Sequence, residues 1–374
     1  MTDERDFQPP DWQTSGLSLY AKTGADVERA LASPRRSTDD FMALLSPAAR
    51  PYLETMAQLS HRLTVQRFGR VQQLFAPLYL SNACANECDY CGFSMSNRVR
   101  RKVLSTDELA TEAAYLKQQG FEHLLLVAGE APRVVGVDYY ERALQQLGPE
   151  MAQISLEVQP LSTEEYRRLH QAGLHAVLVY QETYHRPTYR QHHTRGNKAD
   201  YDNRLAALAR AGDAGIHRLG LGVLLGLADW RLDSLMAAHH LRYLECRCWR
   251  SRFSLSFPRL RPAEGGFQAP HPLSDADLVQ LVCAWRLFSP DLELSLSTRE
   301  PAQLREHLLP LGVTSLSAGS STRPGGYAVE PDAALEQFSI DDNRSLKDVV
   351  AAVQRLDYQP VWKDWDRHLH LAIG

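Results

Sequence analysis

The chain has 374 residues, 44% of them hydrophobic, and a formal net charge of −4. A chain of this length can bury a large core. Charges of both signs are spread along it, so it lacks the basic stripe that is typical of a nucleic-acid-binding protein. No apolar run is long enough to span a bilayer, and the acidic, polar N-terminus is not a secretory signal. Six cysteines are too few for a disulfide framework at this length, and their clustering indicates metal or redox chemistry in a reducing compartment. We therefore expect a soluble, cytoplasmic protein without a nucleic-acid or membrane partner.

The first 70 residues are predicted to form an N-terminal extension that packs on the rest of the chain. The first twenty or so residues carry Pro9 and Pro10 and little periodicity, which indicates an arm. From Gly24 to Gly69 the pattern is helical, with candidate helix caps at Ser37 and Ser46.

Residues 71–374 show a different pattern, in which short apolar runs alternate with amphipathic segments such as Thr106–Gln119 and Ser274–Phe288. The runs are Leu74–Leu80, His123–Val127, Ile154–Val158, Ala176–Tyr180, Leu219–Leu225, Arg252–Phe257, Leu292–Ser297 and Val313–Ser317. Strands that alternate with helices form right-handed βαβ units and a parallel sheet. The sequence therefore predicts an α/β fold, a closed (β/α)8 TIM-type barrel with an N-terminal helical extension and a C-terminal tail.

Chemically informative residues follow most of these runs, where a barrel of this kind gathers its active site. In chain order they are Cys84 to Cys91, Gly129 and Glu130, Glu157 and Gln159, Gln181 and Glu182, Arg259 and Arg261, Arg299, and Ser317 and Ser320. We expect them at one end of the barrel.

The strongest signal is the cysteine triplet Cys84, Cys88 and Cys91. A structural zinc site needs four protein ligands, and no histidine lies between His61 and His123. A [4Fe–4S] cluster on three thiolates leaves one iron open, to which S-adenosylmethionine can bind. The alternative is a non-enzymatic protein whose triplet binds zinc with the help of a distant fourth ligand.

The spacing C-x3-C-x-aromatic-C, with Tyr90 at the aromatic position, resembles the hallmark of the radical S-adenosylmethionine superfamily. The resemblance implies that a 5′-deoxyadenosyl radical is generated from S-adenosylmethionine. It also implies that Glu130, in the VAGE sequence, meets the amino group of the cofactor and that Glu182 meets its ribose. The further candidates for cofactor contact are Ala128, which stands where the superfamily commonly has glycine, and Gly129, Glu157, Gln159 and Gln181.

Longer motifs narrow the resemblance. The segments LYLSNACANECDYCGFSMSNR, FEHLLLVAGE, LEVQPL, VYQETYH, SFPRLRP, LSLSTRE, SxxSxxxPGGY and QPVWKDWD together resemble the family of 2-iminoacetate synthases, the tyrosine lyases of thiamine biosynthesis, from about residue 20 to residue 368. This resemblance implies cleavage of the Cα–Cβ bond of L-tyrosine to 2-iminoacetate and p-cresol, with 5′-deoxyadenosine and methionine. It also implies a thiazole synthase as protein partner. A lyase for another aromatic amino acid, such as tryptophan, is the alternative within the enzyme class.

The tyrosine carboxylate needs a fixed cation, because abstraction of the amino hydrogen demands close orientation. Arg299 is the first choice for a bidentate clamp, with Arg259 and Arg261 as alternatives for the substrate or cofactor carboxylate. Ser317 and Ser320 are candidates for additional hydroxyl donors.

The remaining cysteines are not expected to bind a second cluster. The related tyrosine lyase of FeFe-hydrogenase maturation carries three more cysteines in a C-terminal extension, whereas no cysteine follows Cys283 here. Cys246, Cys248 and Cys283 are interpreted as packing or surface thiols.

Two polar segments carry weaker predictions. The basic run Arg98–Lys102 is expected to steer an acidic electron donor of the flavodoxin type towards the cluster, unless it is only a solvated face. The segment His185–Asp200, with three histidines, is expected to be a lid or a partner-docking surface, with metal binding as the alternative.

Overall fold

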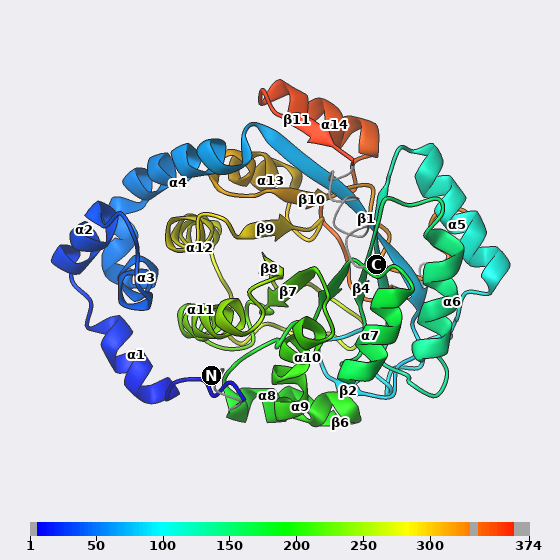
Figure 1. Ribbon diagram of the computed structural model, residues 1–374. Helices are drawn as coiled ribbons and strands as arrows, with labels where there is room; N and C mark the ends of the chain where they lie inside the picture. The colour runs from blue at the N-terminus through cyan, green and yellow to red at the C-terminus, as the bar shows by residue number, and fades with distance from the viewer. Residues whose placement is uncertain (1–5, 330–335, 363–374) are drawn as a thin grey trace.

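The computed structural model describes residues 6–329 and 336–362. Within them, eight parallel strands surround a common axis (Figure 1). They are β1 (Val71–Ser81), β3 (His123–Ala128), β4 (Gln153–Glu157), β5 (Ala176–Leu178), β7 (Arg218–Gly222), β8 (Arg252–Ser256), β9 (Glu293–Leu296) and β10 (Ser315–Ser317). Because β10 pairs in parallel with β1, the sheet closes on itself, and the predicted (β/α)8 barrel is confirmed.

Helices cover the outside of the barrel between successive strands. In chain order they are α5 (Thr106–Gln118), α6 (Val137–Leu147), α7 (Thr163–Gln171), α9 (Tyr201–Leu205), α10 (Ala207–Asp213), α11 (Trp230–Arg247), α12 (Asp275–Phe288) and α13 (Ala302–Leu308), with the 3-10 turn η3 (Leu309–Leu311). Capping boxes fix several starts: Ser105 with Glu108 begins α5 and Ser274 with Asp277 begins α12. After β10, α14 (Leu346–Arg355) leads to β11 (Gln359–Val361), which pairs with the start of β1.

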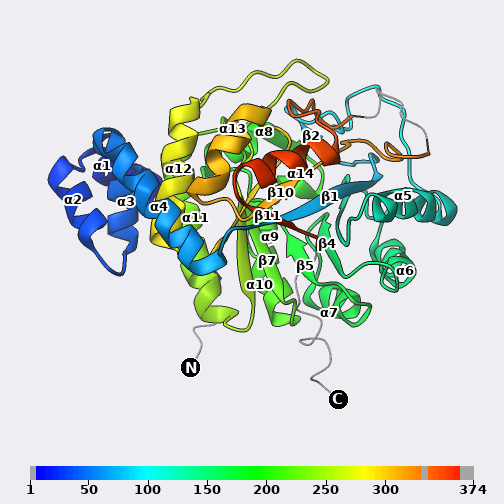
Figure 2. The same ribbon diagram turned by 90° about the horizontal axis from the view of Figure 1, so that it is seen from above.

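The N-terminal region lies outside the barrel wall, beside α11 and α12 (Figure 2). It contains α1 (Trp12–Tyr20), α2 (Gly24–Ala32), α3 (Thr38–Leu45), the 3-10 turn η1 (Pro47–Tyr52) and α4 (Leu53–Phe68). Phe41 of α3 is fully buried, stacks on Phe288 of α12 and packs with a tilted ring against Trp285 of the same helix. The interface is therefore a continuation of the apolar core.

Within the predicted arm, residues 12–20 form the helix α1, which the sequence pattern did not indicate. Asp11 accepts a hydrogen bond from the Thr14 N–H and caps this helix. The apolar side chains of the helix do not share one face: Leu17 is 77% exposed, whereas Leu19 is buried. This mixture removes the periodicity that identifies a helix. Ser37 caps α3 as predicted, whereas the Ser46 hydroxyl donates to the Ala43 carbonyl instead of capping the next turn.

The segment 185–200 does not form a free lid. It contains α8 (Arg186–His192), β6 (His193–Arg195) and the 3-10 turn η2 (Asn197–Ala199), and β6 pairs antiparallel with β2 (Glu87–Cys88) inside the cysteine loop. We call residues 185–200 the brace. No described helix is long and apolar enough to cross a membrane.

Candidate functional site

The three predicted cluster ligands lie in the loop that follows β1. Cys84, Cys88 and Cys91 are free thiols that line one cavity with Gly129 and Glu130, which we call the cysteine cavity. Burial raises the pKa of the Cys84 and Cys88 thiols above the ordinary value. Without iron these thiols therefore stay protonated, and metal binding is coupled to the loss of their protons.

The donor set of this cavity fits an iron–sulfur cluster better than a zinc ion. Among the residues that the structure describes, no three Cys, His, Asp or Glu side chains converge on a single-ion site. A structural zinc ion requires four such ligands at short range. A four-iron cubane holds its cysteine ligands farther apart than one ion does, so three thiols around one cavity fit a cluster.

The basic run after the cysteine loop is largely committed to internal contacts. Arg101 donates hydrogen bonds to the carbonyls of Asn82, Phe93 and Ser94, and Lys102 forms a 3.1 Å ion pair with Glu108. These contacts pin the two ends of the loop together. Of the predicted steering run, Arg98 and Arg100 are the exposed cations.

The brace contacts the cysteine loop through Tyr90, the predicted aromatic position. The Tyr90 hydroxyl lies 2.6 Å from Nε2 of His193, and Nδ1 of His193 lies 2.7 Å from the carbonyl oxygen of Tyr189. A carbonyl only accepts, so Nδ1 carries the proton and Nε2 accepts from the tyrosine. Burial lowers the pKa of His193 to about 2, so the ring is neutral and acts as a structural acceptor.

Two carboxylates predicted for cofactor contact are held by cations from the brace and the helix after it. Glu130 accepts from Nη1 of Arg204 at 2.8 Å and from Nδ2 of Asn86 at 2.9 Å. Burial opposes its charge, but Arg204 and Lys198 outweigh burial and lower its pKa. Glu182 accepts from Nζ of Lys198 at 2.6 Å, and its backbone has a φ of 68°, a strained value for a residue other than glycine. The cationic side chains of Arg204 and Lys198 therefore hold both carboxylates in place.

Two predicted cofactor contacts lie away from the cysteine cavity. Gln159 accepts from the Tyr140 hydroxyl at 2.8 Å and donates to the Val135 carbonyl at 3.1 Å, so both ends of its amide are used inside the protein. Gln181 donates its side-chain amide to the carbonyl of Tyr201. Neither residue lines the cysteine cavity or its neighbour, whereas Ala128 and Gly129 line the cysteine cavity.

A second cavity, which we call the barrel cavity, adjoins the first inside the mouth of the barrel. Its lining includes the predicted residues Tyr90, Glu157, Glu182, Arg299, Ser317 and Ser320, with Tyr79, Tyr180, Lys198, Gln337 and Phe338. Cys91, Glu157 and Glu182 line both cavities, so the two spaces share a wall. Burial and the nearby charge of Glu182 raise the pKa of Glu157 to about 7, although Arg299 opposes the shift.

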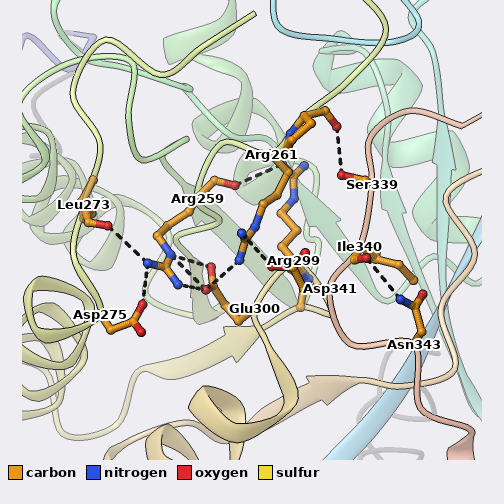
Figure 3. A network of polar contacts seen from close by, with 12 residues as sticks. Arg259, Arg261, Leu273, Asp275, Arg299, Glu300, Ser339, Ile340, Asp341 and Asn343 are labelled. Carbon is orange, nitrogen blue, oxygen red and sulfur yellow. Dashed lines mark hydrogen bonds and ion pairs between the residues drawn. The ribbon is translucent and has the colours of Figure 1, made fainter. Parts of the chain in front are cut away.

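The alternative substrate arginines are engaged in an ion-pair network around the buried Glu300 (Figure 3). Arg259 donates to Glu300 through Nε at 2.9 Å and pairs with Asp275 at 2.8 Å. Arg261 pairs with Glu300 at 3.2 Å and with Asp341 at 2.8 Å. These two guanidinium groups tie neighbouring loops together, so the structure does not support them as carboxylate clamps.

Arg299 is differently placed. Its guanidinium lies over the ring of Phe338, 3.4 Å from the centroid, and Nη1 donates to the Arg259 carbonyl. No described carboxylate lies within ion-pair distance of it, and burial lowers its pKa without removing its charge. The Ser320 hydroxyl is buried without a hydrogen-bond partner in the described chain, whereas the Ser317 hydroxyl accepts from the Thr298 N–H. Arg299 and Ser320 thus have free donors at the barrel cavity.

The residues of the site that the sequence analysis missed include Asn86, Lys198, Arg204 and Gln337. Lys198 and Arg204 come from the brace and from α9, where their charges looked like ordinary surface residues. Asn86 is buried, and its place between two ligand cysteines was the signal that the sequence offered. Gln337 comes from a segment far along the chain and carries no local pattern.

The comparisons with known proteins agree with this geometry. The model of the radical SAM superfamily matches residues 78–238, and that of the biotin and thiamin synthesis associated domain matches residues 256–359. The fold and the cysteine loop therefore define a radical S-adenosylmethionine enzyme. The chain is 51% identical to the 2-iminoacetate synthase of Escherichia coli (strain K12) over 97% of its own length and 96% of that relative. It belongs to the 2-iminoacetate synthase family.

Solved structures support the same placement. A crystal structure of HydG, a maturase of the FeFe-hydrogenase, superimposes with a TM-score of 0.90 at 30% identity, covering 96% of this chain and 81% of HydG. The HydG of Carboxydothermus hydrogenoformans gives a TM-score of 0.85 at 29% identity, covering 96% and 82%.

Proposed function

We propose that this chain is a radical S-adenosylmethionine lyase that cleaves the Cα–Cβ bond of L-tyrosine. The products are 2-iminoacetate and p-cresol, with 5′-deoxyadenosine and methionine, and the imine serves thiamine thiazole synthesis. Family membership over nearly the whole chain supports the reaction. The carrying observation is that the three cysteines and the free guanidinium of Arg299 lie on two adjoining cavities with a shared wall.

In this proposal Cys84, Cys88 and Cys91 hold a [4Fe–4S] cluster, and Glu130 and Glu182 orient S-adenosylmethionine. When bound, these cofactors supply one-electron chemistry that abstracts a hydrogen atom from the substrate amino group. The chain itself binds, orients and excludes water. Tyr90, whose hydroxyl is hydrogen-bonded to His193 of the brace, lines the barrel cavity.

The substrate sits in the barrel cavity. Arg299 binds the tyrosine carboxylate, and the Ser320 hydroxyl donates a further hydrogen bond, which together fix the amino group near the shared wall. Glu157 lies at that wall with a pKa of about 7. A carboxyl group that titrates near neutrality can accept the proton of the substrate ammonium and leave a neutral amine. Phe75 and Phe338 offer apolar surface to the phenol ring.

Two protein partners belong to the proposal. A thiazole synthase consumes the labile imine, and a flavodoxin-type donor supplies electrons. Arg98 and Arg100 are exposed, so their charges can attract an acidic donor. Reversing both charges should slow reduction by the protein donor and leave dithionite-driven turnover unchanged, and equal slowing of both reactions would refute the steering role. The cytoplasmic location stays a prediction.

The decisive experiment uses anaerobically reconstituted protein with reductant, S-adenosylmethionine and L-tyrosine, and detects p-cresol and 5′-deoxyadenosine by mass-resolved chromatography. We expect both products, lost together in Cys88→Ala. Formation of 5′-deoxyadenosine without p-cresol would exclude tyrosine as the substrate. L-tryptophan would then be tested in the same assay. A colourless protein that retains zinc would instead support the non-enzymatic alternative.

A further inference from the structure

The segment 336–342, which we call the strap, lies across the barrel mouth and is docked on the cysteine loop. The Gly92 N–H, next to Cys91, donates to the carbonyl of Gln337 at 3.0 Å. A Cβ atom at position 92 would lie 2.6 Å from that carbonyl oxygen, so only glycine permits this approach. At its other end, the Asp341 N–H donates to the Thr298 carbonyl at 3.0 Å. The strap is therefore held between the cysteine loop and the loop after β9.

The side chain of Gln337 turns from the strap towards a predicted cluster ligand. Its Nε2 lies 3.7 Å from Sγ of Cys91, and its Oε1 accepts from the Tyr79 hydroxyl at 2.7 Å. Burial raises the pKa of Tyr79 well above its ordinary value, so this hydroxyl keeps its proton and donates. Because a ligand thiolate only accepts, the amide must present its NH2 group to the sulfur. Both neighbours thus require the same amide orientation.

We propose that Gln337 is a positioning residue that donates a hydrogen bond to the Cys91 thiolate and so sets the reduction potential of the cluster. The inference rests on the proposed function, since it requires a cluster on Cys84, Cys88 and Cys91. Reduction adds negative charge that spreads onto the cluster and its thiolates. A donor aimed at a ligand sulfur stabilises the reduced form more than the oxidised form and raises the potential. Gln337, which lies far along the chain from the cysteine motif, would thereby control the reduction of the cluster.

The test is a redox titration of the reconstituted cluster, followed by electron paramagnetic resonance, with iron and sulfide content measured in parallel. Gln337→Leu removes the donor and should shift the midpoint to a more negative potential. A tenfold fall in the ratio of reduced to oxidised cluster at fixed potential corresponds to about 59 mV for one electron. Gln337→Glu, which removes the donor and adds negative charge, should shift it further. Gln354→Leu, on the exposed face of α14, is the matched control and should leave the potential unchanged.

Tyr79→Phe provides an independent variant, because it frees the amide without changing the strap or the loop. It should shift the potential in the same direction as Gln337→Leu, by less. A wild-type potential in Gln337→Leu with full iron content would overturn the inference and leave the proposed function standing. If Gln337→Leu fails to assemble a cluster, a wild-type potential in Tyr79→Phe overturns it instead. A wild-type protein without any cluster would refute the proposed function itself.

Discussion

Three arginines stand at neighbouring strand ends, and their partners decide what each can do. Arg259 and Arg261 neutralise Glu300, whereas Arg299 faces the barrel cavity without a carboxylate in the described chain. Arg299→Gln should reduce kcat/KM for L-tyrosine by about 10- to 100-fold, because a hydrogen bond to a charged group contributes about 1.5–3 kcal/mol. The measurement is the initial rate of p-cresol formation against tyrosine concentration.

Arg259→Gln is the matched control for this prediction. It removes one of the two arginines that neutralise the buried Glu300, so the protein should melt at a lower temperature. Because Arg261 still pairs with Glu300, the cost should be below the value of about 3–5 kcal/mol for a buried charge left without a partner. The KM for tyrosine of the folded fraction should stay near the wild-type value. The opposite pattern, an unchanged KM in Arg299→Gln and a raised KM in Arg259→Gln, would exchange the roles of the two residues.

The raised pKa of Glu157 makes stability depend on pH in a direction that can be stated in advance. Its pKa rises from 4.5 to about 7 on folding, through burial and the charge of Glu182. Between these values the folded state holds a proton that the unfolded state has lost, so stability falls as pH rises from 4.5 to 7. Glu157→Gln should therefore gain melting temperature over the wild type as pH rises through this window and keep the gain above it. A difference that is constant with pH would contradict the shift.

At the scale of elements, the strands and several helix starts were predictable because their signals are local. The apolar runs mark all eight barrel strands, and Ser37 and Ser274 mark helices through capping boxes. Strand ends also placed Glu157 and Arg299 at the cavities. What failed depended on long-range partners. The orientation of the Gln159 amide is set by Tyr140 on the preceding helix, α6, and by the Val135 carbonyl, and nothing in the local sequence pattern indicates either contact.

The brace offers a test of an element that the sequence did not reveal as part of the site. Gly196 has a φ of 84°, and a Cβ there would lie 2.2 Å from Oδ1 of Asn86 in the cysteine loop. Gly196→Ala should push the brace away from the loop, giving less iron per chain after reconstitution and faster bleaching in air. Gly173→Ala is the control: its φ is 98° with nothing within 4 Å, so it should show only backbone strain of about 1–2 kcal/mol and normal iron content. Equal iron loss in both variants would mean that backbone strain alone, and not the contact with Asn86, causes the loss.

At the scale of the whole molecule, the segments that cover the cysteine loop differ from those that complete the apolar core. The brace and the strap converge on the cysteine loop, one from the segment after β5 and the other from beyond β10. The N-terminal helices instead pack on α11 and α12 at the outer wall. Changes in the N-terminal region should therefore alter stability without altering the chemistry. The predicted domain boundary at residue 70 stays a prediction.

Phe41→Ala tests that separation. The side chain is fully buried between α3 and α12, against Trp285 and Phe288, so its truncation should cost about 3–5 kcal/mol of unfolding free energy. Leu17→Ala, at a residue that is 77% exposed on α1, should stay within about 0.5 kcal/mol of the wild type. Denaturant unfolding measures both, and the KM for tyrosine and the cluster potential should be unchanged in the folded protein. If Phe41→Ala shifted the cluster potential as Gln337→Leu does, the N-terminal helices would have to be counted as part of the catalytic assembly, because packing at α12 would then reach the cysteine loop through the barrel.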